Sequence, residues 1–124
     1  MKKLAGKNSK QRGNWGEEIA HDYLVSTGYE IIKRNYRGGD GEIDLIARKQ
    51  GVVYFVEVKA RKKGAMVSPI ESITPNKKKR MKSAVLAWLS QHGRLDTPCS
   101  FFMVLIELPE SGERPKIEVI EDYI

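Results

Sequence analysis

The sequence predicts an α/β domain with the order helix, three strands, helix, two strands. Three observations indicate this class: two segments have the apolar spacing of amphipathic helices, two neighbouring segments alternate in polarity like the arms of a hairpin, and a later segment is an almost unbroken apolar run. The expected elements are a helix over residues 14–27, strands over 29–36, 42–48 and 52–61, a helix over 76–92, and strands over 101–108 and 116–121.

The first helix is expected to begin at Asn14, a residue type that caps helices, and to end before Gly28, where a helix-ending glycine belongs. Its apolar face consists of Trp15, Ile19, Ala20, Tyr23 and Leu24. After the first strand, the Gly-Gly-Asp-Gly run at 38–41 is a loop by composition. Residues 1–12 are expected to form a flexible basic tail, which leaves 13–124 as a single domain.

The second and third strands are so close in sequence that they are expected to form an antiparallel hairpin. A two-residue turn that starts at Gln50 and a four-residue turn around it both pair residues whose numbers add to 101. In that register Asp44 lies opposite Glu57, and Glu42 lies opposite Lys59. A three-residue turn would break this pairing unless a bulge corrected it.

The second helix is expected to end at Gly93. Its apolar face consists of Met81, Ala84, Val85, Trp88 and Leu89. The apolar run over 101–108 is typical of a strand that is buried on both faces. Residues 116–121 alternate in polarity, as an edge strand does.

Composition narrows the functional classes. The single cysteine, Cys99, excludes an intramolecular disulfide and a cysteine zinc cluster, which favours a cytoplasmic setting, and no segment has the length of a membrane helix. Residues 1–94 carry 20 basic and 9 acidic side chains, whereas residues 95–124 carry 2 and 7. A basic body suggests a polyanionic partner, most commonly nucleic acid, although a basic protein without such a partner has the same composition.

The hairpin register brings two carboxylates together. Directly opposed residues have Cβ atoms roughly 4.5–5.5 Å apart, and like charges at that separation are destabilising. Asp44 and Glu57 therefore need a proton or a cation between them. Mg²⁺, or Mn²⁺ in its place, is the expected cation, because Mg²⁺ is held by one or two carboxylates together with water and substrate phosphate.

Two further residues are candidates for this site. Lys59 points to the same side of its strand as Glu57, where an ammonium group stabilises charge on a reacting phosphate or positions the attacking water. The alternative for this pair is an ordinary surface salt bridge. Glu17 lies at the edge of the first helix's apolar face and is expected to look toward the sheet; the alternative is a favourable interaction with the helix dipole.

Two groups of cations are expected to contact nucleic acid. They are Lys77, Lys78 and Arg80 at the start of the second helix, and Arg61, Lys62 and Lys63 where the third strand leaves into a loop. Cations near a helix start oppose the helix dipole, and a phosphate backbone would relieve that cost. The alternative for the helical group is a solvated face with no ligand.

Two runs carry a resemblance to a known signature: Gly-Glu-Ile-Asp-Leu-Ile at 41–46 and Val-Glu-Val-Lys-x-Arg at 56–61. Together they resemble the (P)D…(D/E)xK signature of the restriction-endonuclease-like nucleases. With Gly-x-x-Gly-Glu-x-x-Ala at 13–20 and Gly-Tyr at 28–29, the chain looks like the bacterial YraN family, which is related to archaeal Holliday-junction resolvases. The resemblance covers roughly residues 13–90.

The resemblance implies a restriction-endonuclease-like fold with a central mixed β-sheet flanked by helices. It also implies that Asp44 and Glu57 bind a divalent metal, that Lys59 acts on the attacking water, and that Glu17 matches the first-helix glutamate of the resolvases. The function expected from it is a metal-dependent endonuclease that acts on DNA, in particular branched or structured DNA, as a homodimer. Two alternatives stay open: a nucleic-acid-binding protein that keeps the fold but cuts nothing, and an interaction protein whose acidic end docks on a basic partner.

Overall fold

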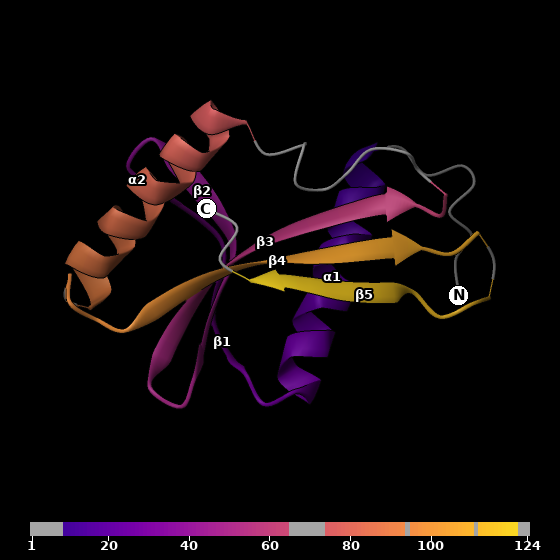
Figure 1. Ribbon diagram of the computed structural model, residues 1–124, viewed down its shortest axis with the longest axis horizontal. Helices are drawn as coiled ribbons and strands as arrows, with labels where there is room; N and C mark the ends of the chain where they lie inside the picture. Colours follow the sequence, from indigo (N-terminus) through magenta and orange to yellow (C-terminus); the bar gives the residue numbers. More distant parts are fainter. Residues whose placement is uncertain (1–8, 65–73, 94, 111, 122–124) are drawn as a thin grey trace.

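The computed structural model describes residues 9–64, 74–93, 95–110 and 112–121. Its elements are α1 (Ser9–Ser26), β1 (Glu30–Gly38), β2 (Gly41–Lys49), β3 (Val52–Lys62), α2 (Pro75–His92), β4 (Cys99–Leu108) and β5 (Lys116–Glu121) (Figure 1). The order of elements predicted from the sequence is confirmed. None of the helices in these ranges is long and apolar enough to span a membrane.

The start of the first helix differs from the prediction. The helix α1 begins at Ser9, so Asn14 lies inside it and is not its N-cap. Residues 9–12 of the expected flexible tail are therefore helical, and residues 1–8 of that tail lie outside the described residues. Helix formers such as Gln11 precede Asn14, and the preference of asparagine for caps is weak enough for a continuing helix to override it.

The five strands form one mixed sheet in the order β1-β2-β3-β4-β5. The neighbours β3 and β4 are parallel and the other three pairs are antiparallel, and α2 lies in the connection that returns the chain from the end of β3 to the start of β4. The helix α1 packs mainly on β3 and β4, whereas α2 packs on β2 and β1 (Figure 1). This is the α/β architecture of the restriction-endonuclease-like fold, with a mixed sheet between helices.

The predicted hairpin register is confirmed where the two strands pair. The pairs run from Lys49 opposite Val52 to Leu45 opposite Val56. The turn has two residues, and both adopt left-handed conformations, with φ of 52° at Gln50 and 80° at the following glycine. Such turns match the twist of a hairpin.

Beyond Leu45 the strands β2 and β3 separate. The pairing with β3 ends at Leu45 opposite Val56, so Glu42 does not lie opposite Lys59 in the ladder as predicted, and Asp44 and Glu57 are not a ladder pair either. On its other side Glu42 pairs with Arg37 of β1. Where the ladder has opened, the carboxylate of Asp44, in place of a backbone carbonyl, accepts a hydrogen bond from the backbone N–H of Val58. The hydrogen-bonded ladder thus ends immediately before Asp44 on β2 and Glu57 on β3.

Two apolar clusters cover the two faces of the sheet. The cluster on the α1 side contains Ala20, Leu24, Leu45, Val56, Phe102, Val104, Ile106 and Leu108. The cluster on the α2 side contains Tyr36, Ile43, Ile46, Val53, Phe55, Met81, Ala84, Val85, Trp88 and Leu89. Asp44 and Glu57 face α2, since both line a pocket with Lys77, Arg80 and Met81 of that helix.

The contact between α1 and β3 depends on a glycine. A Cβ atom on Gly16 would lie 2.6 Å from the Cβ of Ala60, which is closer than two such atoms approach in folded proteins. The helix therefore reaches the strand backbone directly, and this close contact bears on how near α1 comes to Glu57 on the same strand.

We expect Gly16→Val to lower the free energy of unfolding by about 1–3 kcal/mol, because the new side chain overpacks the contact with Ala60. Ala60→Gly made in the same chain should restore a large part of the loss, since it removes the opposing Cβ atom. Urea denaturation of the two variants and the parent protein measures both effects. A double variant no more stable than Gly16→Val would show that this contact does not limit the packing of α1.

Candidate active site

Two carboxylates face α2 at the point where β2 and β3 separate. Glu57 is 6% exposed and is the one buried charged residue among those that the structure describes. Asp44 is half-buried, and its Oδ2 accepts a hydrogen bond of 2.8 Å from the backbone N–H of Val58. Asp44 and Glu57 line the same pocket, and the charge of Glu57 contributes to the raised pKa of the Asp44 carboxyl.

Burial, followed by the negative charge of Glu57, raises the pKa of the Asp44 carboxyl to about 8. The N–H of Val58 opposes the shift, and the hydrogen bond with Glu57 and the charge of Glu17 add to it. At neutral pH such a pair holds a proton between its members or attracts a cation.

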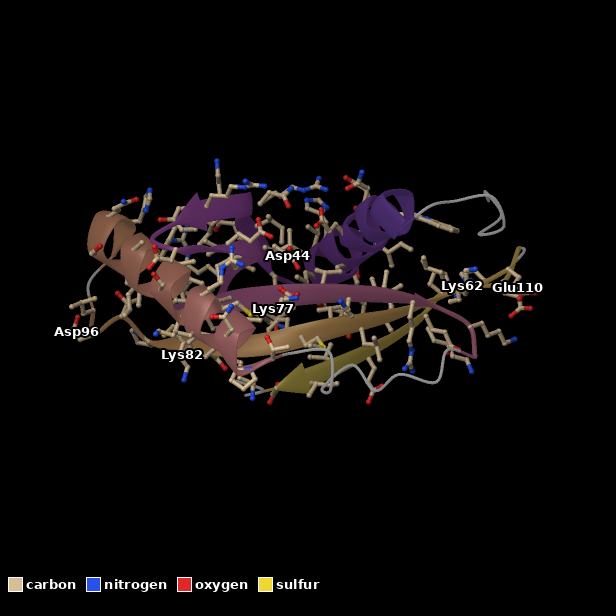
Figure 2. All side chains as sticks on the ribbon, turned by 90° about the horizontal axis from the view of Figure 1, so that it is seen from above. Asp44, Lys62, Lys77, Lys82, Asp96 and Glu110 are labelled. Carbon is tan, nitrogen blue, oxygen red and sulfur yellow. The ribbon has the colours of Figure 1, made fainter. Side chains whose placement is uncertain are left out.

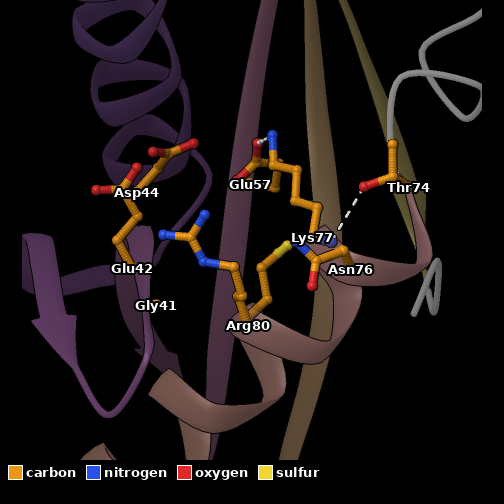
Figure 3. Close-up of a pocket in the computed structure, with 9 residues that line it drawn as sticks. Gly41, Glu42, Asp44, Glu57, Thr74, Asn76, Lys77 and Arg80 are labelled. Carbon is orange, nitrogen blue, oxygen red and sulfur yellow. Dashed lines mark hydrogen bonds and ion pairs between the residues drawn. The ribbon is translucent and has the colours of Figure 1, made fainter.

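The N-terminal turn of α2 supplies positive charge to this pair. The Nζ of Lys77 lies 2.6 Å from the Oε1 of Glu57. Thr74 caps the helix, since its hydroxyl accepts a hydrogen bond of 3.1 Å from the backbone N–H of Lys77 (Figure 3). The cap thereby fixes the backbone from which the Lys77 side chain reaches the buried carboxylate.

Arg80 lies one helical turn further along α2. Its Nε donates a hydrogen bond of 3.0 Å to the backbone carbonyl of Asp40, in the turn between β1 and β2. Its guanidinium group points into the space between Asp44 and Glu57 (Figure 3). Within the described ranges Arg80 forms no ion pair.

These groups surround a pocket of about 230 Å³. It is lined by Gly41, Glu42, Asp44, Glu57, Thr74, Asn76, Lys77, Arg80 and Met81. The described residues contain no group of three or more histidine, cysteine or acidic side chains placed to hold a metal. The carboxylates that line the pocket are those of Glu42, Asp44 and Glu57.

Lys59 does not line the pocket, although it lies two residues after Glu57 on the same face of β3. Its side chain is half-buried and forms none of the ion pairs between described residues. The ammonium group beside Glu57 is that of Lys77. Sequence reasoning assigned Lys77 to phosphate alone, because no local pattern shows which strand residue a helix 20 residues away will meet.

Glu17 lies near the carboxylate pair without lining the pocket. Burial raises the pKa of its carboxyl, while Arg34 and a hydrogen bond with the side chain of Asn35 lower it, and the charges of Glu57 and Glu42 raise it further. The neighbouring Glu18 instead pairs with Arg34 at 2.6 Å. The role predicted for Glu17 therefore stays a prediction.

Asn35 is a site neighbour that sequence reasoning missed. Its neighbours on β1, Arg34 and Tyr36, pair with Leu45 and Ile43 of β2, so Asn35 lies level with Asp44. Its φ of 51° is left-handed, a conformation that asparagine tolerates better than most residues. An asparagine in the middle of a strand is a signal for such a kink, but the sequence offers no means to say which acidic residue the kink faces.

The second group of expected nucleic-acid contacts lies apart from the pocket. Figure 2 shows Lys62 at the far end of β3 from Asp44. Lys63 forms an ion pair of 3.3 Å with Glu113, and none of Arg61, Lys62 and Lys63 lines the pocket. Lys78, on α2, is half-buried and also lies outside the pocket lining.

The sheet order and the two helices define an α/β protein whose architecture is consistent with the restriction-endonuclease-like fold. The model of the family described as "Uncharacterised protein family UPF0102" matches residues 16–106, and the chain belongs to this family. A UPF0102 protein of Trichlorobacter lovleyi is 40% identical over 118 residues, which cover 94% of this chain and 92% of that protein. A relative in Geotalea uraniireducens is 41% identical, covering 93% and 90%, and one in Syntrophomonas wolfei is 39% identical, covering 93% and 99%.

We expect Asp44→Asn to gain stability relative to the parent protein as the pH rises from 5 to 9 in the presence of a chelator. The folded-state pKa of Asp44 is raised to about 8 from an ordinary value of 3.8, so the folded parent binds more protons than the unfolded chain in this window and loses stability as they dissociate. Asparagine carries no such charge and still accepts the hydrogen bond from Val58.

Denaturant titrations at pH 5 and pH 9 measure the free energy of unfolding of both proteins. The stability of the variant relative to the parent should increase by at least about 1 kcal/mol between these pH values, and a pKa difference of one unit already corresponds to slightly more than this. The matched control is Glu118→Gln, because Glu118 is exposed and forms none of the ion pairs between described residues. If the free energy of unfolding depends on pH in the same way for Asp44→Asn and the parent, the ionisation of Asp44 does not destabilise the folded protein.

Proposed function

We propose that the protein is a metal-dependent phosphodiesterase that cleaves DNA, with branched or structured DNA as the substrate class to examine first. The observation that carries the proposal is the buried carboxylate pair of Asp44 and Glu57 in a pocket that also presents Lys77 and Arg80. Acidic and basic groups around one hollow suit a cation and a phosphate that bind side by side.

The carboxylate pair fits Mg²⁺ or Mn²⁺. Asp44 and Glu57 would hold the ion, since both are oxygen donors and since their mutual repulsion leaves a place for positive charge. When bound, such an ion supplies positive charge to the phosphate and lowers the pKa of an attacking water.

The remaining roles belong to the basic residues of the chain. Arg80 is placed to bind a phosphate oxygen, because its Nε is anchored on Asp40 while the rest of the guanidinium faces the pocket. Lys77 neutralises Glu57 in the free protein and can turn to the phosphate once another cation takes its place. Lys59, which the signature places on the attacking water, would have to direct its side chain toward the pocket when substrate binds.

A second candidate function is DNA binding without cleavage. The ion pair of 2.6 Å between Lys77 and Glu57 favours it, because that pair already neutralises one of the two carboxylates. Cleavage assays over single-stranded, duplex and branched DNA with Mg²⁺ or Mn²⁺ separate the two functions. Asp44→Ala, which removes half of the carboxylate pair, serves as the inactive control.

We expect Glu57→Gln to abolish metal-dependent cleavage while DNA affinity stays equal or increases slightly, because glutamine keeps the shape of the side chain and removes a charge that holds the cation and repels phosphate. Lys59→Ala should leave metal binding intact and reduce the cleavage rate by ~10²–10³ if its ammonium stabilises developing charge. Single-turnover cleavage and binding assays on both variants measure this. Parent-like cleavage by both variants would reduce the signature to a structural strand pair.

We expect Lys77→Gln to bind Mg²⁺ several-fold more tightly than the parent protein, because the ammonium no longer competes for the Oε1 of Glu57. Lys79→Gln removes the same charge from an exposed position of α2 that does not line the pocket, so it controls for the change in overall charge. Calorimetric titration in the absence of DNA measures both affinities. The expected order fails if Lys77→Gln binds no more tightly than Lys79→Gln.

A further inference from the structure

A line of three hollows runs from the carboxylate pair across the turn between β1 and β2. The pocket described above shares Gly41, Glu42 and Arg80 with a second hollow of about 410 Å³ that covers the turn. The second hollow shares Arg37 with a third of about 440 Å³, which lies between β1 and the C-terminal half of α2. Together they form a continuous surface, the turn groove, that begins at the proposed reaction centre.

The floor of the turn groove is held firmly. The backbone N–H of Asp40 donates a hydrogen bond of 3.0 Å to the hydroxyl of Ser83, and its carbonyl accepts the one from Arg80. A side chain at Gly39 would meet Ser83, and one at Gly41 would meet the backbone carbonyl of Arg80. The turn therefore lies directly on α2, and its glycines allow this close approach of the two backbones.

Two arginines border this groove. The guanidinium of Arg80 stands at the end nearest the carboxylates, and Arg37, whose side chain is 84% exposed, stands where the second and third hollows meet. The pairing of Arg37 with Glu42 at 3.5 Å is loose and exposed, so it contributes little to stability. Lys33 adds a further cation at the third hollow.

We infer that the turn groove binds the sugar–phosphate backbone of the nucleic-acid strand next to the reacting phosphate, with Arg80 and Arg37 on successive phosphates. The inference rests on the proposed function, and it adds a path for the strand that leaves the site across β1, away from the cations at the end of β3. Asp40 and Glu42 also line the second hollow, so a bound strand would replace the loose pair of Arg37 with Glu42. Two separated arginines suit a polyanionic chain better than a single phosphate.

The test is equilibrium binding of a 20-nucleotide single-stranded DNA in a chelator, over a series of salt concentrations. Arg37→Gln should weaken binding roughly 5- to 10-fold and lower the slope of log affinity against log salt by about 0.7, the value of one phosphate contact on a single strand. Arg80→Gln should weaken binding at least as much. Arg48→Gln is the matched control, because Arg48 pairs with Glu30 and lines none of the three hollows.

Because no metal or cleavage is involved, the groove and the nuclease proposal fail separately. If Arg37→Gln loses affinity but the parent protein never cuts DNA, the proposal of the groove is supported and the proposal of catalysis is refuted. Binding by Arg37→Gln that matches Arg48→Gln overturns the groove, and so does a parent protein that does not bind the oligonucleotide. Thermal melting of Arg80→Gln shows whether its weaker DNA binding results from unfolding. Arg37 is exposed, so Arg37→Gln is not expected to affect folding.

Discussion

The burial of Glu57 is the constraint around which this site is arranged. A carboxylate 6% exposed, beside a second carboxylate, is costly unless positive charge or a proton compensates it. Three features provide compensation: the ammonium of Lys77, the N–H that Val58 gives to Asp44, and the opening of the β2–β3 ladder that makes this N–H available. An apolar pair at these positions would continue the sheet with less difficulty, which is why the acidic pair points to chemistry.

The helix α2 ties that compensation to the rest of the fold. One of its faces fills the core with residues such as Trp88, and its first turns carry Lys77 and Arg80 to the carboxylates. The cap at Thr74 and the contact with the β1–β2 turn set the position of the helix along the sheet. Packing and electrostatics thus depend on the same docking, and a shift of α2 would disturb both.

The sequence predicted the elements and the meeting of Asp44 with Glu57, because strand periodicity and a short turn fix a hairpin register locally. It did not predict that the ladder opens beyond Leu45, since this depends on a side chain replacing a backbone acceptor. Nor did it reveal the partnership of Lys77 with Glu57, which requires knowing where a helix docks. The early start of α1 was missed because helix capping preferences are weaker than the continuity of a helix.

The parallel pairing of β3 with β4 has a consequence for how the chain reaches this structure. The antiparallel strands β1, β2 and β3 are joined by short turns and their contacts are local, whereas β4 joins β3 only after α2 has crossed over the sheet. Contacts between distant parts of a chain form later than local ones. The two acidic side chains meet through a hairpin closed by a two-residue turn, whereas Lys77 reaches Glu57 from the longer connection that leads to β4, so the balance of charge at the site depends on the less local contacts of the fold.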